Sequence, residues 1–398
     1  MAISAALDQF AQYPKLLQRL RDARVGLLAH GASVTNDFVH IADVLKIAGI
    51  QPALWFAPEH GFYGTLQDMA TVSDEATGEN LIRSLYGQRF DDLTPRAEDL
   101  AKIDLLLIDL QDVGSRYYTF VWTAVLALRA CTRAGIEVIV LDRPNPIGTR
   151  QDAIEGDMQD RAFLSFVGLE PIPVRHSSTL GALVAYFAER DGTSHAVSIV
   201  PARGGADGAN ARSWPRGFVW PSPNMPTFET ALVYPGGCLL EGTNLSEGRG
   251  TTRPFEVFGA PWLDEHKLTA AFHSLQLPGI RVRPLAYEPT FHKYAQQLVR
   301  GVQVHVTNET TFRPYASYLA LITLAHHHHP DQFRFRTERY EFVDHIPAFD
   351  LLTGSASARA AIEAFASPND VVEITQIEPD VARAFASETV TAFRRHSL

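Results

Sequence analysis

The sequence predicts an α/β protein in which a doubly wound parallel sheet is followed by a second, smaller α+β domain. The first observation is that short apolar runs alternate with helical patterns through the first 200 residues. The second is that the runs at 103–110 and 136–141 are apolar almost throughout, as in strands buried on both faces. The third is the length of 398 residues, which exceeds what one hydrophobic core usually supports. We expect the domains to span residues 1–230 and 231–398.

The elements expected in the first domain follow this alternation. Strands are expected at 25–29, 53–56, 103–110, 136–141 and 197–200. Helices are expected at about 37–48, 119–134 and 178–189. Gly135 is a typical helix stop and Ser178 a typical N-cap, which supports one end of each of the last two helices.

Residues 214–262 interrupt the alternation, because they are rich in Gly, Pro, Thr and Asn and contain few apolar runs. We expect a long ordered loop here, and such loops in compact proteins are usually functional. The elements expected beyond it are strands at 281–285 and 302–306 and helices at 314–326, 356–366 and 381–395. These form the smaller α+β domain.

The composition excludes several classes of protein. With 46% hydrophobic and 20% charged residues, the chain is typical of a soluble globular protein rather than a disordered one. A net charge of −10 opposes binding to nucleic acid or to anionic membrane surfaces. No apolar stretch approaches the roughly 18 residues that span a bilayer, and residues 1–24 lack a signal-peptide pattern, so we expect a cytoplasmic protein. Cys131 and Cys238 alone exclude a disulfide framework.

Polar clusters follow three of the predicted strands, at 57–64, 111–119 and 142–146. Because ligands bind beyond the carboxyl ends of parallel strands, these loops predict a functional rim. Glu59 stands between Pro58 and the His60-Gly61 pair, where flanking aromatic residues partly desolvate it and could make it a general acid. The alternative is a carboxylate that caps a helix or pairs with an arginine.

Other polar residues allow both functional and structural interpretations. Asp112 and Arg116 could bind a ligand or pair with each other, and Asp109 is interpreted as a structural acid. Arg175 and His176 precede a helix, where His176 could hold a sugar hydroxyl or an anion, or simply pack. The segment 241–250 is dense in hydrogen-bonding groups, which suits a sugar site and a structural loop equally well.

The run His326–His329 does not predict a metal site. It ends a predicted helix before Pro330, where histidines satisfy the last carbonyl groups and suit the negative end of the helix dipole. The H-E-x-x-H, P-loop, G-x-S-x-G and G-x-G-x-x-G motifs are all missing from the sequence. We therefore expect neither a metal nor a nucleotide cofactor.

The chain also contains a set of long sequence blocks: PEHGFYG, DLQDVGSRYYT, DRPNPIG, VGLEPIPVRHSSTLGAL, WPSPNMPT, YPGGCLLEGTNLSEGRGTTRPFEVFGAPW and FDLLTGS. Together they resemble a bacterial glycoside hydrolase family, the exo-acting β-N-acetylmuramidases of the NamZ type, over residues 24–395. The resemblance implies a Rossmann-like catalytic domain, a cleft between two domains and no cofactor. It also implies release of non-reducing terminal N-acetylmuramic acid from peptidoglycan fragments in cell-wall turnover or recycling. The family's proposed catalytic glutamate is Glu59 here.

Glycoside hydrolysis normally needs a second carboxylate besides the acid. Glu241 and Glu247 are favoured, because their loop could close over the sugar, and Asp112 is a further candidate. The residues expected to bind the substrate, a muramyl disaccharide or muropeptide, are His60, Asp112, Arg116, Tyr117, Arg175, His176, Asn224, Asn244, Arg249 and Arg253.

The lactyl carboxylate of muramic acid calls for a cation, and arginine suits it best. The candidates are Arg116, Arg175, Arg249 and Arg253. Alternatively, Arg249 and Arg253 tie their loop to Glu247 and Glu256. A different class of function is a non-catalytic muropeptide or sugar-binding protein that uses the same cleft. A peptidase or amidase is disfavoured, because no nucleophile–base signature is present.

Overall fold

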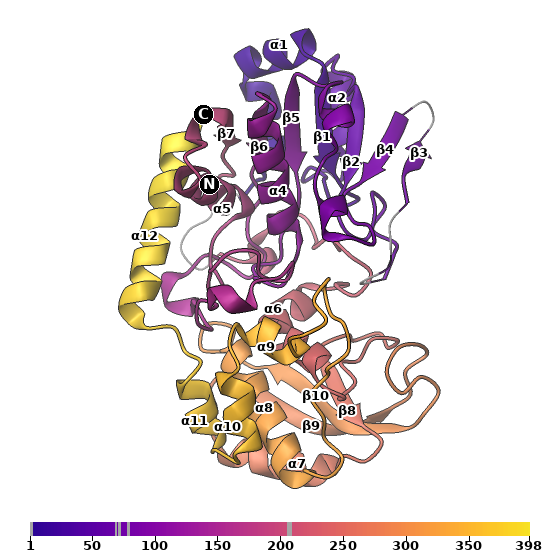
Figure 1. The fold of residues 1–398 in the computed structure, drawn as a ribbon, viewed down its shortest axis with the longest axis vertical. Helices are drawn as coiled ribbons and strands as arrows, with labels where there is room; N and C mark the ends of the chain where they lie inside the picture. Colours follow the sequence, from indigo (N-terminus) through magenta and orange to yellow (C-terminus); the bar gives the residue numbers. More distant parts are fainter. Residues whose placement is uncertain (1–2, 68–69, 71–72, 78–79, 205–208) are drawn as a thin grey trace.

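The first domain is built on a seven-stranded sheet (Figure 1). The computed structural model describes residues 3–67, 70, 73–77, 80–204 and 209–398. The strands are β1 Val25–Ala29, β2 Leu54–Ala57, β3 Glu75–Thr77, β4 Asn80–Ser84, β5 Leu105–Asp109, β6 Glu137–Leu141 and β7 Val197–Val200. Their order is β3-β4-β2-β1-β5-β6-β7, with β3 antiparallel and the others parallel. Without β3, this is the strand order of a Rossmann-like doubly wound sheet, with its switch point between β1 and β5.

Helices cover both faces of this sheet, as the apolar runs predict. Leu105 and Leu107 pack with one set of helices, whereas Leu106 and Ile108 point the other way and pack with the second set. The first set consists of η1 Ala6–Gln12, α1 Pro14–Asp22 and α2 Ile41–Ile47. The second set consists of α4 Phe120–Arg133 and α5 Leu180–Arg190. The short helix α3 Ala97–Leu100 precedes β5.

The five predicted strands of the first domain are confirmed to within two residues at either end. The edge strand β3 and its neighbour β4 were not predicted, because both are short and largely polar. The helix expected from residue 37 begins at Ile41 instead, since the His40 side chain accepts the Ala42 N–H and caps it there.

The second domain combines a three-stranded antiparallel sheet with helices, which confirms the predicted α+β class. Its elements are α6 Phe228–Gly237, η7 Cys238–Gly242, β8 Val257–Ala260, α7 Glu265–Ser274, β9 Ile280–Tyr287, β10 Val299–Val306, α8 Pro314–His328, α9 Ala348–Thr353, α10 Ser357–Glu363 and α11 Pro368–Glu373. The sheet order is β8-β10-β9. The predicted strands at 281–285 and 302–306 lie within β9 and β10, each of which is longer than predicted.

The expected long loop at 214–262 is wrong in part, because it contains α6, η7 and β8. The sequence Pro235-Gly236-Gly237 suggests a turn, yet it forms the end of α6. A Cβ atom on Gly236 would lie 2.1 Å from the Pro314 carbonyl oxygen at the start of α8. The glycine therefore serves close packing between two helices rather than a turn.

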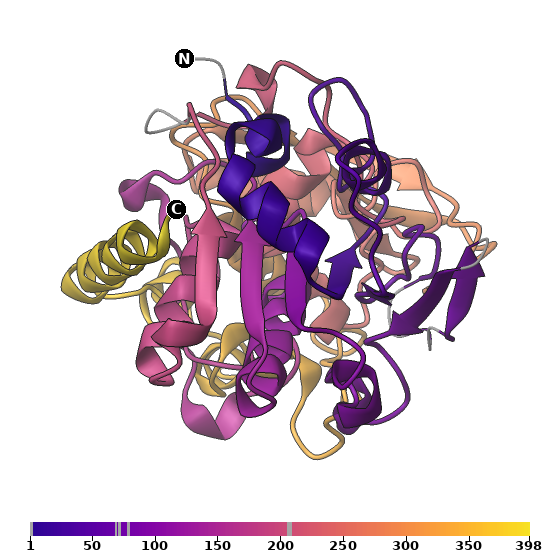
Figure 2. The ribbon, with the colours of Figure 1, turned by 90° about the horizontal axis from the view of Figure 1, so that it is seen from above.

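The last helix, α12 Pro379–His396, returns from the second domain and lies along α5 of the first (Figures 1 and 2). The Phe385 ring meets the Tyr186 ring edge-on with centroids 5.6 Å apart, and the Leu398 N–H donates to the Ile199 carbonyl at 2.9 Å. The border at residue 230 stays a prediction. However, the C-terminal helix α12 packs against the first domain, although it follows the second domain in the sequence.

Candidate active site

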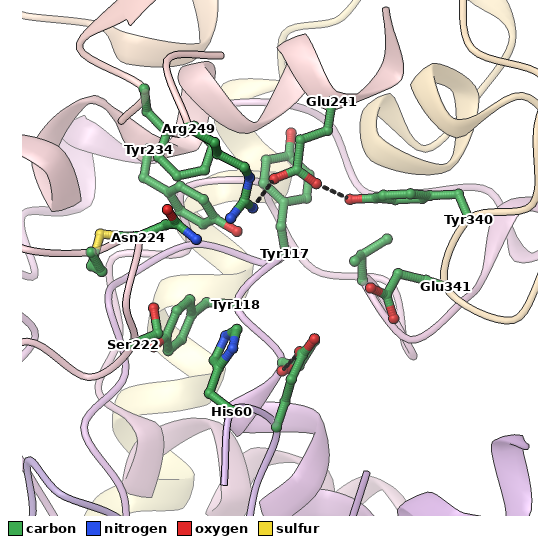
Figure 3. Close-up of a pocket in the computed structure, with 15 residues that line it drawn as sticks. His60, Tyr117, Tyr118, Ser222, Asn224, Tyr234, Glu241, Arg249, Tyr340 and Glu341 are labelled. Atoms are coloured by element: carbon green, nitrogen blue, oxygen red, sulfur yellow. Dashed lines mark hydrogen bonds and ion pairs between the residues drawn. The ribbon is translucent and has the colours of Figure 1, made fainter. Parts of the chain in front are cut away.

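A pocket lies between the two domains, lined by residues of both (Figure 3). The first domain lines it with Glu59, His60, Tyr117, Tyr118, Thr119 and Val167, and the segment leading to α6 adds Ser222, Asn224 and Met225. The second domain lines it with Tyr234, Glu241, Arg249, Phe255, Tyr340 and Glu341. The loops after β2 and β5 therefore meet at one site, as the rim argument predicts.

The third predicted rim loop, 142–146, does not line this pocket and instead supports the fold. Asp142 accepts the Gly181 N–H at 2.8 Å, and burial raises the pKa of its carboxyl to about 7. Arg143 forms a buried ion pair with Asp109 and donates to the Val34 carbonyl at 2.9 Å. Asp109 is thus confirmed as a structural acid.

Glu59 is held at the pocket wall by the turn that follows β2. The Gly61 N–H donates to the Pro58 carbonyl at 3.1 Å, which closes a tight turn around Glu59 and His60. His60 adopts a left-handed φ of 72°, which costs a non-glycine residue about 1–2 kcal/mol, and its Nδ1 contacts the Leu66 carbonyl at 2.8 Å. Such strain at a loop is typical of a functional site.

The buried Glu59 carboxyl faces the start of α4. Thr119, at the N-cap of α4, donates its hydroxyl to Glu59 Oε2 at 2.7 Å. The Glu59 side chain is only 4% exposed, so the group is withdrawn from bulk water but faces the pocket. A carboxyl in this position can deliver a proton to a ligand, which is the role the sequence predicts for it.

Glu241 is bonded at both oxygens within the pocket. An Arg249 guanidinium nitrogen lies 2.6 Å from Glu241 Oε1, and the Tyr340 hydroxyl donates to Oε2 at 2.7 Å, as the dashed lines in Figure 3 mark. The Arg249 guanidinium also lies over the Phe255 ring, 5.1 Å from its centroid. The carboxylate is thus fixed as a hydrogen-bond acceptor, which suits orienting a sugar.

Glu247 lies outside the pocket wall, surrounded by nitrogen atoms of three basic side chains. His292 Nδ1, Lys293 Nζ and Arg249 Nε approach its carboxylate to 2.9, 3.0 and 3.3 Å. Full burial favours the protonated form, but Lys293, His292 and Arg249 outweigh it and hold the pKa of Glu247 well below its ordinary value. This carboxylate ties the loop together, so its predicted catalytic role finds no support in the geometry.

Asp112, Arg116 and His176 are buried, bond to other protein groups and do not line the pocket. Asp112 Oδ2 lies 3.2 Å from His176 Nε2 and accepts the Gly114 N–H at 2.7 Å. Arg116 donates to three carbonyl groups, at 2.7–2.8 Å. The suggested Asp112–Arg116 pair is therefore wrong, because each side chain bonds elsewhere.

Three more predicted binding residues also have structural partners away from the pocket. Arg175 donates to the Ile147 carbonyl at 3.0 Å, and burial lowers its pKa to about 10. Asn244 bonds the backbone around residues 332 and 334 at 2.9 Å. Arg253 lies 3.2 Å from Glu256, which is the alternative that the sequence left open. Of the ten predicted binding residues, the pocket brings together His60, Tyr117, Asn224 and Arg249.

Sequence reasoning missed much of the pocket wall, above all its aromatic residues. Tyr234 packs edge-on against Phe255 and Tyr118, with ring centroids 4.9 and 6.1 Å apart. Tyr118 and Thr119 lie in a loop that the sequence had already singled out, so that signal was available. Tyr340 and Glu341 follow no strand or helix and carried no comparable signal.

The four histidines at the end of α8 are packed against protein groups. His326 and His327 lie beside the Phe365 ring, at centroid distances of 5.0 and 5.3 Å, and His329 Nε2 accepts the Asp264 N–H at 3.1 Å. Burial lowers the pKa of all four rings. Among the described residues, no group of three or more His, Cys, Asp or Glu is placed to hold a metal ion. Within the same ranges, no helix is long and apolar enough to cross a membrane.

Comparison with protein families identifies the chain. Residues 25–229 match the family described as exo-β-N-acetylmuramidase NamZ, N-terminal, and residues 232–388 match its C-terminal counterpart. The chain belongs to the NamZ family. Its similarity to the peptidoglycan β-N-acetylmuramidase NamZ of Bacillus subtilis (strain 168) is 36% identity over 363 residues, covering 90% of this chain and 84% of that protein.

Two solved structures of DUF1343 family proteins share the whole fold of this chain. A DUF1343 family protein of Bacteroides fragilis NCTC 9343 superposes with a TM-score of 0.82 at 26% identity, covering 100% of this chain and 99% of that one. A second DUF1343 protein of the same organism gives a TM-score of 0.74 at 24% identity, with 98% of each chain covered, and supports the fold alone. Both domains and their arrangement are thus features of the NamZ fold.

Proposed function

We propose that this NamZ family member is a glycoside hydrolase that removes N-acetylmuramic acid from the non-reducing end of peptidoglycan fragments. The observation that carries the proposal is Glu59, a buried carboxyl held by a strained turn and by Thr119 at the wall of the pocket between the domains. It can protonate the leaving oxygen as the glycosidic bond breaks.

The shape and lining of the pocket support action on one terminal sugar. Its wall combines tyrosine rings, which pack against sugar faces, with the Glu241 carboxylate, which accepts hydrogen bonds from hydroxyl or amide groups. The substrate we propose is the disaccharide in which N-acetylmuramic acid is linked to N-acetylglucosamine, free or at the end of a longer fragment. Arg249 is the one of the four candidate arginines that lines the pocket, and we assign the lactyl carboxylate to it.

A chromogenic aryl β-N-acetylmuraminide tests the proposal. The expected result is steady release of the aryl group, with the corresponding N-acetylglucosaminide cleaved much more slowly or not at all. A non-catalytic binding protein would release nothing, although calorimetry would still detect binding of N-acetylmuramic acid. Binding without release would therefore reject hydrolysis in favour of a sugar-binding role.

A further inference from the structure

The segment Tyr340–Val343 is a two-residue hairpin with an unusual sequence. The Tyr340 N–H donates to the Val343 carbonyl at 2.8 Å, and the Val343 N–H donates back to the Tyr340 carbonyl at 2.9 Å. The two loop residues, Glu341 and Phe342, both have left-handed φ values, of 43° and 70°. Turns of this kind normally use Asn-Gly or Asp-Gly, because a side chain at positive φ costs about 1–2 kcal/mol. A glutamate and a phenylalanine held in this strained backbone conformation indicate a function.

The strained hairpin directs neighbouring side chains into the pocket. The Tyr340 hydroxyl bonds Glu241, and the Glu341 carboxylate accepts from the Tyr86 hydroxyl at 3.3 and 3.5 Å. Figure 3 shows Tyr340 and Glu341 entering from one side, opposite Arg249. Glu341 is only 5% exposed and lines the pocket, so the turn holds its carboxylate at the pocket wall.

The Tyr86 hydroxyl connects Glu341 with Glu59. It is buried and forms hydrogen bonds with both carboxyl groups, and burial together with these charges raises the pKa of the phenol, which therefore stays protonated. The phenol thus links Glu59 and Glu341, and a pair of carboxyl groups is what glycoside hydrolysis uses.

Glu341 also marks the boundary between two hollows. Glu341 and Tyr86 also line a second, open hollow next to the pocket. This hollow has about 960 Å³ of empty space, and its other lining residues include Arg89, Arg339 and Phe342. A substrate with its terminal sugar in the pocket and the remainder in this hollow would place the scissile bond beside Glu341. Glu241, by contrast, has both oxygens bonded to Arg249 and Tyr340, which makes it a poorer electron-pair donor.

We propose that Glu341 is the second catalytic carboxylate of this enzyme, acting with Glu59 as the acid. The proposal rests on the hydrolase activity proposed above. Glu59 gives its proton to the leaving oxygen as the C1–O bond breaks. Glu341 either takes a proton from the water that bonds to C1, or bonds to C1 itself until a second step hydrolyses that ester. Both routes yield the free sugar and the free alcohol. In the first route the water proton ends on Glu341 and passes to solvent while Glu59 regains a proton from solvent; in the second route Glu59 takes the proton from the water that hydrolyses the ester.

The test uses Glu341→Gly and Glu341→Gln, with an aryl muraminide and the natural disaccharide as substrates. Glycine relieves the positive φ, so Glu341→Gly should melt no lower than the wild type, and lost activity cannot then be ascribed to unfolding. We expect both variants to lose about 10²- to 10⁴-fold in kcat on both substrates, because this role does not depend on the leaving group. Added azide or formate should restore at least about ten-fold to Glu341→Gly, by replacing the missing carboxylate.

The matched control is Glu338→Gln, which removes an exposed carboxylate of the same segment, 4.0 Å from Arg336, and should keep wild-type kcat. The proposal is overturned if Glu341→Gly keeps more than about a tenth of wild-type kcat, or if neither small anion restores activity. A wild-type protein that cleaves neither substrate would instead reject the hydrolase function, and the role of Glu341 with it.

Discussion

Glu59, Glu241 and Glu341 are three buried carboxyl groups in one pocket, and their neighbours give them different chemistry. Glu241 is bonded by a cation and a phenol, whereas Glu59 and Glu341 share the Tyr86 hydroxyl. Sequence analysis could find Glu59, because a Pro-Glu-His-Gly turn after a predicted strand is a local signal. It could not find Glu341, whose partner lies 255 residues away along the chain.

Arg249 provides the residue-scale prediction. If its guanidinium holds the lactyl carboxylate, Arg249→Met should raise KM for an aryl muraminide about 10- to 100-fold, the worth of one charge-assisted hydrogen bond of about 1.5–3 kcal/mol. Residual activity on the glucosaminide should change little. Arg253→Met is the comparison, since this arginine is half exposed and lies outside the pocket wall, and its KM should stay unchanged. Equal losses on both sugars would show that Arg249 acts through Glu241 rather than on the lactyl group.

At the scale of elements, the strands of the first domain were predictable because each is a short run buried on both faces. The segment from α6 to β8 was not, because its glycines look like turn formers and in fact allow backbones to pack closely, as at Gly236 and Gly259. The loop that carries Glu247 shows a related limit. Its acid looks catalytic by composition, but only its place beside Lys293, His292 and Arg249 shows that it holds the loop together.

Glu247→Gln should therefore destabilise the protein, by about 3–5 kcal/mol at pH 7, because it removes the counter-charge beside the buried Arg249 and the partly buried Lys293. The depressed pKa of Glu247 means that its stabilising effect is present above about pH 4.3, the value in an unfolded chain, and is lost as the pH falls below it. The difference in melting temperature from wild type should accordingly be large at pH 7 and shrink towards pH 3. A difference that stays the same across this range would contradict the assignment.

At the scale of the whole molecule, one apolar core runs from the first domain into the second, and α12 closes the chain back onto α5. The sequence predicts a helix near its C-terminus but not its destination, because an amphipathic pattern shows that one face is buried and not against what. The pocket could not be predicted for the same reason, because its two walls come from segments far apart in the sequence that only the arrangement of the domains brings together.

Phe385→Ala tests the role of α12. Removing a buried ring from the contact with Tyr186 should cost about 3–5 kcal/mol and lower the urea midpoint of unfolding, while KM for the muraminide stays unchanged. Val381→Ala, an exposed position on the same helix, should change the midpoint little. An unaltered midpoint for Phe385→Ala would mean that α12 adds no stability to the first domain.

The central claim is that the pocket containing Glu59 releases a single terminal sugar. The most direct measurement is mass spectrometry of the products formed from a glycan that ends in N-acetylmuramic acid, for the wild type, Glu59→Gln and the exposed control Glu98→Gln. The wild type and the control should release N-acetylmuramic acid as the first product, and Glu59→Gln should do so about 10² to 10⁴ times more slowly. Internal fragments as first products, or wild-type release by Glu59→Gln, would contradict the account.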